Sequence, residues 1–204
     1  MNEKFFALPE EKQRAIINAG YRVFSQSPYK KSPMSEIADA AGISKSLLFH
    51  YFRNKKELYL FLLENGARVT AEYVENAGCY DQADVFEMMY RGLQAKMRLM
   101  KRHLDMSAFV LKAYYERDPE LRCQIQDLIE KYGSFQTNGP RLKLDPERFV
   151  PGLDLRMMYQ NMYLAGEGYL WEQIQQGSLD VEKMEREYMK MINFWKSIYL
   201  RKEA

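Results

Sequence analysis

Residues 34–52 read MSEIADAAGISKSLLFHYF, and this stretch decides the fold of the N-terminal part of the chain. Its pattern predicts two short helices that cross at a steep angle and are joined by a sharp turn. Ala38 supplies the small side chain needed at the crossing, and Gly42, four residues later, permits the positive φ that the turn requires. The small core between these helices is expected to contain Ile37, Ala41, Ile43, Leu48 and Tyr51.

The second helix of this pair presents a polar and aromatic outer face. The side chains left outside the small core are Lys45, Ser46, Phe49 and His50. A helix with such a face fits the major groove of DNA, where side chains near its N-terminus reach the base edges. We therefore predict base contacts from Ser46, Phe49 or His50.

Two lysines and a tyrosine are expected to contact the phosphate backbone. Lys45 and Lys55 each lie in the first turn of a helix, where free backbone N–H groups already favour an anion. Tyr51 can donate its hydroxyl to a phosphate while its ring stays packed. Such phosphate contacts position a protein on DNA, whereas base contacts specify the sequence.

The segments around this motif also read as helices. Before it we expect a helix over residues 9–25, whose buried residues are Ala15, Ile16, Ala19, Val23 and Phe24. Ser32 is expected to cap the first helix of the motif, and Ser44 the second. Residues 54–57 form a capping box that begins a helix over residues 54–76.

Apolar residues recur at helical spacing through most of the remaining chain. The helices expected there cover about residues 83–103, 105–116, 118–136, 154–176 and 180–201. Residues 137–154 carry three prolines and two glycines and form the longest irregular segment. The sequence thus predicts an all-α protein: a helix-turn-helix domain at 1–52 and a helical regulatory domain at 53–204, with 54–76 as the connecting helix.

Charge is distributed unevenly along the chain. The net charge is +2, but residues 1–60 hold ten lysines and arginines against six acidic residues. A basic end on a mildly acidic body suits contact with a polyanion at that end.

Composition also excludes several classes of protein. No stretch approaches the roughly 20 apolar residues that cross a bilayer, and the N-terminus is too acidic for a signal peptide. We expect a cytoplasmic protein with no membrane partner. With only two cysteines, Cys79 and Cys123, and two histidines, His50 and His103, we expect no metal site, no disulfide framework and no cofactor.

The runs EIA at 36–38, AGISK at 41–45, LFHYF at 48–52 and KKEL at 55–58 resemble the signature of the TetR family of bacterial repressors. The resemblance covers about residues 9–60 and implies a homodimer that binds double-stranded DNA at a palindromic operator. It also implies a ligand pocket in each C-terminal body, and repression as the usual mode. The residues that match the family's DNA contacts are Ser44, Lys45, Ser46, Phe49, His50, Tyr51 and Lys55.

The C-terminal region is rich in methionine and aromatic residues. Methionine fills irregular shapes and tyrosine places a polar tip in an apolar wall, so a pocket built from them suits a small apolar or aromatic effector. We expect this pocket among the helices at 83–116 and 157–171. Its predicted lining is Phe86, Tyr90, Phe109, Tyr114, Tyr159 and Tyr163.

The last two long helices each carry an apolar stripe. The predicted dimer interface contains Leu155, Met162, Gly166, Tyr188, Met191 and Trp195. The small residues Ala165, Gly166 and Gly168 would let a partner helix approach closely. The alternative is that both stripes are buried within one chain, but the stretch 191–199 is apolar on more than one face, which favours a four-helix interface.

Together these features predict a dimeric repressor that is released from a palindromic operator by its effector. Two other classes stay open. An architectural or adaptor protein would use the same DNA-binding head without a ligand. An enzyme would carry its site in residues 77–204, but no carboxylate pair, nucleophile–base set or metal spacing stands out there, so we expect no enzyme.

Overall fold

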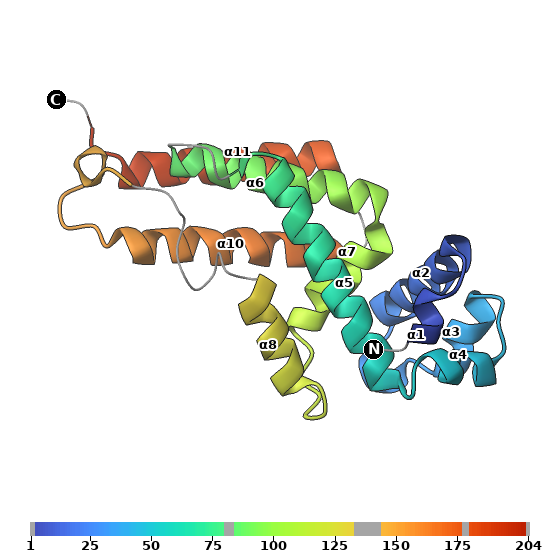
Figure 1. The fold of residues 1–204 in the computed structure, drawn as a ribbon. Coiled ribbons are helices and arrows are strands. Elements are labelled where there is room, and N and C mark those ends of the chain that lie inside the picture. The colour runs from blue at the N-terminus through green and yellow to red at the C-terminus, as the bar shows by residue number, and fades with distance from the viewer. Residues whose placement is uncertain (1–2, 80–83, 133–143, 177–179, 203–204) are drawn as a thin grey trace. The chain divides into compact units, whose positions relative to one another are not determined.

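The computed structural model describes residues 3–79, 84–132, 144–176 and 180–202, and these residues are almost entirely helical (Figure 1). The only β-structure among them is one isolated antiparallel bridge between Phe149 and Leu200. The predicted all-α fold class is confirmed.

The chain divides into two compact units. The first contains residues 1–69 and 102–132, and the second contains residues 70–101 and 133–204. Helix α5 (Lys55–Asn76) begins in the first unit and ends in the second. The predicted domains at 1–52 and 53–204 divide the chain by role, and this division stays a prediction. The helices at 104–114 and 122–132 fall in the predicted regulatory domain but belong to the first unit.

The first unit consists of α1 (Glu3–Phe6), α2 (Glu10–Gln26), the 3-10 helix η1 (Tyr29–Lys31), α3 (Met34–Ala40), α4 (Lys45–Tyr51), most of α5, α7 (Leu104–Tyr114) and α8 (Arg122–Tyr132). Its centre is an aromatic cluster in which α2, α5 and α7 meet. The Phe24, Tyr59 and Phe109 ring centroids lie 4.9–5.8 Å from one another. Gly66 lets α5 approach α7, since a Cβ atom there would lie 2.5 Å from Val110 Cγ2.

Two local predictions in this unit are wrong, and one helix was not predicted. Ala15 is exposed because the buried face of α2 follows Ile16, Ala19 and Val23. Ser32 does not cap α3: its buried hydroxyl donates to the carbonyl oxygens of residues 27 and 28, at 3.3 and 3.0 Å, and Pro33 takes the N-cap position. Helix α1 was not expected at all.

The second unit contains the end of α5, α6 (Val85–Arg102), the 3-10 helix η3 (Pro146–Arg148), α10 (Leu155–Gln175) and α11 (Val181–Tyr199). Asp84, Asp154 and Asp180 each cap one of the three long helices by accepting backbone N–H groups at 2.8–3.1 Å. Helix α6 is joined to α10 by an ion pair between Lys96 and Glu167, and to α11 by a hydrogen bond that Gln94 donates to Glu185 at 3.2 Å.

The expected helices lie within a few residues of the observed ones. Two segments are exceptions. The helix predicted at 118–136 is observed as the shorter α8, which covers Arg122–Tyr132, and the segment predicted as irregular at 137–154 is only partly described. Residues 133–143 fall outside the described residues, and residues 146–148 form η3. Among the described residues, no helix is long and apolar enough to cross a membrane.

Candidate nucleic-acid interface

The turn between α3 and α4 has the predicted geometry. Gly42 adopts φ +67°, and the Ile43 N–H donates to the Ala38 carbonyl at 3.0 Å, which closes the turn. Ile37, Ala38 and Leu48 are completely buried, whereas Ala41 and Ile43 are half-buried. A small apolar core between α3 and α4 therefore holds α4 in place, as the sequence indicates.

The outer face of α4 is open to solvent. Lys45, Ser46, Phe49 and His50 are all exposed. Phe49 gives this face one large apolar side chain, and Leu47, elsewhere on α4, is exposed to the same extent. Such side chains can contact a thymine methyl group in the major groove.

The N-terminus of α4 is fixed by its first residues. The Ser44 hydroxyl accepts a hydrogen bond from the Leu47 N–H at 3.2 Å, as predicted for an N-cap. The Ser44 and Ser46 hydroxyl oxygens lie 3.0 Å apart. Ser44 therefore stabilises the N-terminus of α4, whether or not it also contacts DNA.

Tyr51 closes α4 on its inner side. Its side chain is only 8% exposed, and its ring centroid lies 6.3 Å from that of Phe5 in α1. Phe5 in turn packs on Phe52 and Phe61, at 5.0 and 5.3 Å. The short helix α1 thus supports the end of α4. No periodic pattern could reveal a helix of four residues, although its two adjacent phenylalanines were a signal.

Lys55 lies in the first turn of α5, as predicted, but its ammonium has partners within the protein. Its ammonium donates to the carbonyls of Tyr29 and Lys30, at 2.8 and 3.3 Å, and lies 4.4 Å from the Tyr29 ring centroid. It therefore ties α5 to η1, and a contact with phosphate would have to use the one remaining N–H donor.

The capping box at the start of α5 is present in a modified form. Asn54 Oδ1 accepts from the Glu57 N–H at 2.8 Å. The Glu57 carboxylate reaches back one residue further than expected and accepts from the Arg53 N–H at 2.8 Å. The connection between α4 and α5 is thereby fixed at both ends.

The loop after α7 holds η1, the segment that leads into α3. The Tyr29 N–H donates to Glu116 at 3.4 Å, and Lys30 pairs with Asp118 at 3.5 Å. The ammonium of Lys112 donates to the Ser25 carbonyl at 3.1 Å. These contacts join the helix-turn-helix to α7 within the first unit.

The six residues predicted to line a ligand pocket lie in two different units. Phe109 and Tyr114 belong to the first, where Phe109 fills the aromatic cluster; Phe86, Tyr90, Tyr159 and Tyr163 belong to the second. Tyr159 and Tyr163 lie together on α10 with ring centroids 6.4 Å apart, and burial raises the pKa of Tyr159 to about 12. The lining role of the six stays a prediction.

The predicted dimer stripe is wrong for four of its six residues. Met162, Gly166, Tyr188 and Trp195 are buried inside the second unit, where they join α10 to α11. The packing is close, because a Cβ atom on Gly166 would lie 2.9 Å from the Tyr188 hydroxyl oxygen. Leu155 and Met191 are half-buried.

Another apolar set on the same two helices is open to solvent. Met157 and Leu164 on α10 are each 58% exposed, and Phe194 and Ile198 on α11 are 60% and 42% exposed. Gly168 is also exposed, and among the described residues no other part of the chain packs against the position of its Cβ. We call Met157, Leu164, Phe194 and Ile198 the outer apolar set.

Comparisons with known proteins agree with this architecture. Residues 16–61 match the model of the TetR family of bacterial regulatory proteins. Over 64 residues the chain is 39% identical to the transcriptional activator FasR of Mycolicibacterium smegmatis, an alignment that covers 31% of this chain and 29% of that protein. The matched part is therefore less than a third of that relative.

Two solved structures are similar over nearly the whole chain. One is a TetR-family transcriptional regulator from Chloroflexus aurantiacus, with a TM-score of 0.74 and 20% identity over 98% of this chain and 99% of that one. The other is FadR from Bacillus subtilis in complex with stearoyl-CoA, with a TM-score of 0.65 and 18% identity over 88% and 96%. At these identities the likeness establishes the fold.

Proposed function

This chain belongs to the TetR family of bacterial regulatory proteins, and we propose that it is a ligand-responsive transcriptional regulator that binds double-stranded DNA through α4. The observation that carries the proposal is the exposed outer face of α4 on a rigidly capped helix-turn-helix. We assign DNA contacts to Ser44, Lys45, Ser46, Phe49, His50, Tyr51 and Lys55. A regulator of this kind acts in the bacterial cytoplasm and catalyses no reaction.

The test is a titration of operator-containing DNA from the upstream region of the protein's own gene. Lys45→Ala should lower the affinity and the salt dependence, because each phosphate contact contributes about 0.9 to the slope of log K against log salt. In a dimer the slope should fall by roughly 1.8. Lys183→Ala, an exposed lysine of α11, is the matched control. An unchanged slope for Lys45→Ala would contradict the assignment.

Dimerisation is proposed to use the outer apolar set. Exposed side chains of this size on two neighbouring helices suit a two-fold four-helix interface. Such a dimer places two copies of α4 in successive major grooves, so the operator is a palindrome with half-sites ~34–36 Å apart. Phe194→Glu should yield monomers in sedimentation experiments, whereas Tyr115→Glu, at another exposed aromatic position in the first unit, should leave dimers.

The effector is proposed to be a small apolar or aromatic molecule bound in the second unit, near Tyr159 and Tyr163. FadR, a structural relative in complex with stearoyl-CoA, makes acyl thioesters the first compounds to test. Because α5 belongs to both units, it is the proposed lever between effector and α4. By linkage, the effector and the operator must weaken each other's binding by the same factor.

The sign of regulation is proposed to be repression, the usual mode of the family. FasR, to which 31% of this chain is similar, is named an activator, so this similarity does not decide the sign. A reporter gene under the upstream region should therefore be more active when the gene for this protein is deleted. Lower reporter activity in the deletion strain would identify an activator instead.

A further inference from the structure

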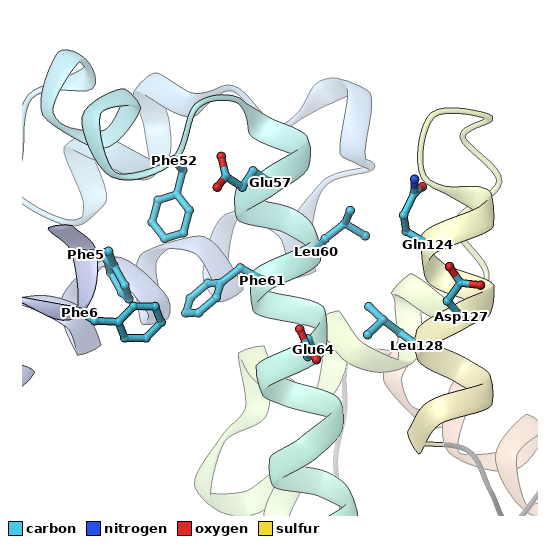
Figure 2. A pocket seen from close by; sticks show the side chains of 10 residues that line it. All are labelled: Phe5, Phe6, Phe52, Glu57, Leu60, Phe61, Glu64, Gln124, Asp127 and Leu128. Atoms are coloured by element: carbon cyan, nitrogen blue, oxygen red, sulfur yellow. The ribbon is translucent and has the colours of Figure 1, made fainter. Parts of the chain in front are cut away.

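A groove crosses α5 in the first unit, between α1 on one side and α8 on the other (Figure 2). It encloses about 330 Å³, a volume at the lower end of the range for small-molecule sites. All its walls belong to the same compact unit, and none of them is part of the exposed face of α4.

One part of the groove is apolar and aromatic. Phe6 of α1 is 47% exposed, and its ring centroid lies 6.0 Å from that of the half-buried Phe61 of α5. In Figure 2, Leu60 points from α5 toward α8, where Leu128 points back toward it. Phe5, which is buried beneath Phe6, fixes the short helix that presents this ring.

The charged residues of the groove have one sign. Glu57, Glu64 and Asp127 line it, and none of its ten lining residues is basic. Lys131 binds the Glu64 carboxylate from outside the lining at 2.6 Å and offsets one negative charge. This hydrogen bond also holds the pKa of Glu64 below its usual value, so the carboxylate stays ionised at neutral pH. A net negative potential therefore accompanies the aromatic wall.

We propose that this groove binds a small organic cation with an aromatic or alkyl body. The Phe6 and Phe61 rings line the groove and can attract a cation, while Glu64 on α5 and Asp127 on α8 supply opposite charge. The leucines then cover the apolar body of the guest. An anion of the same shape would be repelled, and the small volume does not accommodate a helix of a partner protein. This site is separate from the effector site proposed in the second unit.

Calorimetric titration of the full-length protein with tetraphenylphosphonium tests the proposal, with tetraphenylborate as an anion of matching shape. The cation should bind saturably and the anion should not. Asp127→Asn should weaken binding of the cation roughly fivefold, since one unit charge at about 4 Å in water contributes about that factor. Glu64→Gln should weaken binding of the cation more than Asp127→Asn does, because it also leaves the positive charge of Lys131 without the Glu64 carboxylate that offsets it.

Glu130→Gln removes an acidic residue of α8 that does not line the groove, and it is the matched control. Phe6→Leu keeps the apolar surface but removes the ring, and should also weaken binding. Equal binding of both ions, no binding of the cation, or the same affinity in Asp127→Asn and Glu130→Gln would overturn the proposal. Operator binding is measured in parallel, so failure of the DNA-binding proposal is seen separately.

Discussion

Tyr51 offers a way to separate support of α4 from contact with DNA. Its ring is almost completely buried against Phe5, whereas its hydroxyl is the predicted phosphate donor. Replacement of a buried aromatic residue by alanine costs about 3–5 kcal/mol. That is a large share of the roughly 5–15 kcal/mol by which a domain is stable. Tyr51→Ala should therefore lose operator binding because the end of α4 and α1 lose their packing.

Tyr51→Phe keeps the ring and removes only the hydroxyl. A hydrogen bond to a charged acceptor contributes about 1.5–3 kcal/mol, so affinity for each half-site should fall roughly tenfold to hundredfold. The free energy of unfolding, measured by urea denaturation with circular dichroism, should not change. Operator affinity is measured by fluorescence anisotropy on the same samples.

Either of two results would refute this reasoning. If Tyr51→Phe binds the operator like the unmodified protein, the hydroxyl makes no contact with DNA. If Tyr51→Ala unfolds at the same urea concentration as the unmodified protein, the ring does not support the fold as its burial indicates.

Three further predictions concern the first unit. Gly66→Ala should lower the free energy of unfolding by about 1–3 kcal/mol in urea denaturation, since the new methyl group meets Val110 at 2.5 Å; a stabilised variant would contradict this. Ser44→Ala should lose about 1 kcal/mol of stability, whereas Ser44→Asp should keep the cap to Leu47 yet bind DNA more weakly through charge repulsion; equal DNA binding would exclude contact near Ser44. Burial raises the pKa of Tyr21 from 10.0 to about 12. The buried neutral hydroxyl therefore contributes its full share to the free energy of unfolding below pH 10.0, and this share falls by about 1.4 kcal/mol per pH unit as the pH rises toward about 12. Tyr21→Phe should reduce this fall in denaturation curves recorded at several pH values.

The helix-turn-helix could be predicted from the sequence because neighbouring residues decide its geometry. Ala38 and Gly42 are four residues apart and act on the same turn, and Ser44 caps the helix that follows at once. Helix α1 shows the opposite case. Its four residues are too few for a period, and what makes it a helix is burial of Phe5 against Phe52 and Phe61, more than forty positions later.

Lys55 illustrates how a correct local signal can still give an incomplete role. Its place in the first turn of α5 indicates an anion contact, but its ammonium lies on the carbonyls of Tyr29 and Lys30. That contact joins residues 25 and 26 positions apart, which local reasoning about a helix start does not include. A lysine beside a helix terminus can therefore hold the fold of the DNA-binding unit and still have a donor left for phosphate.

The dimer stripe was misassigned for a reason that lies in α10 itself. Apolar residues occur on more than one side of this helix: Met158 and Met162 face the interior, while Met157 and Leu164 face solvent. Periodicity finds apolar stripes, but it does not say which stripe packs within the chain. A helix with two such stripes needs two partners, and α11 covers only one of them through Gly166. Alanine at Met162 should therefore lower the stability of the folded chain, whereas a charged residue at Leu164 should lower only its self-association.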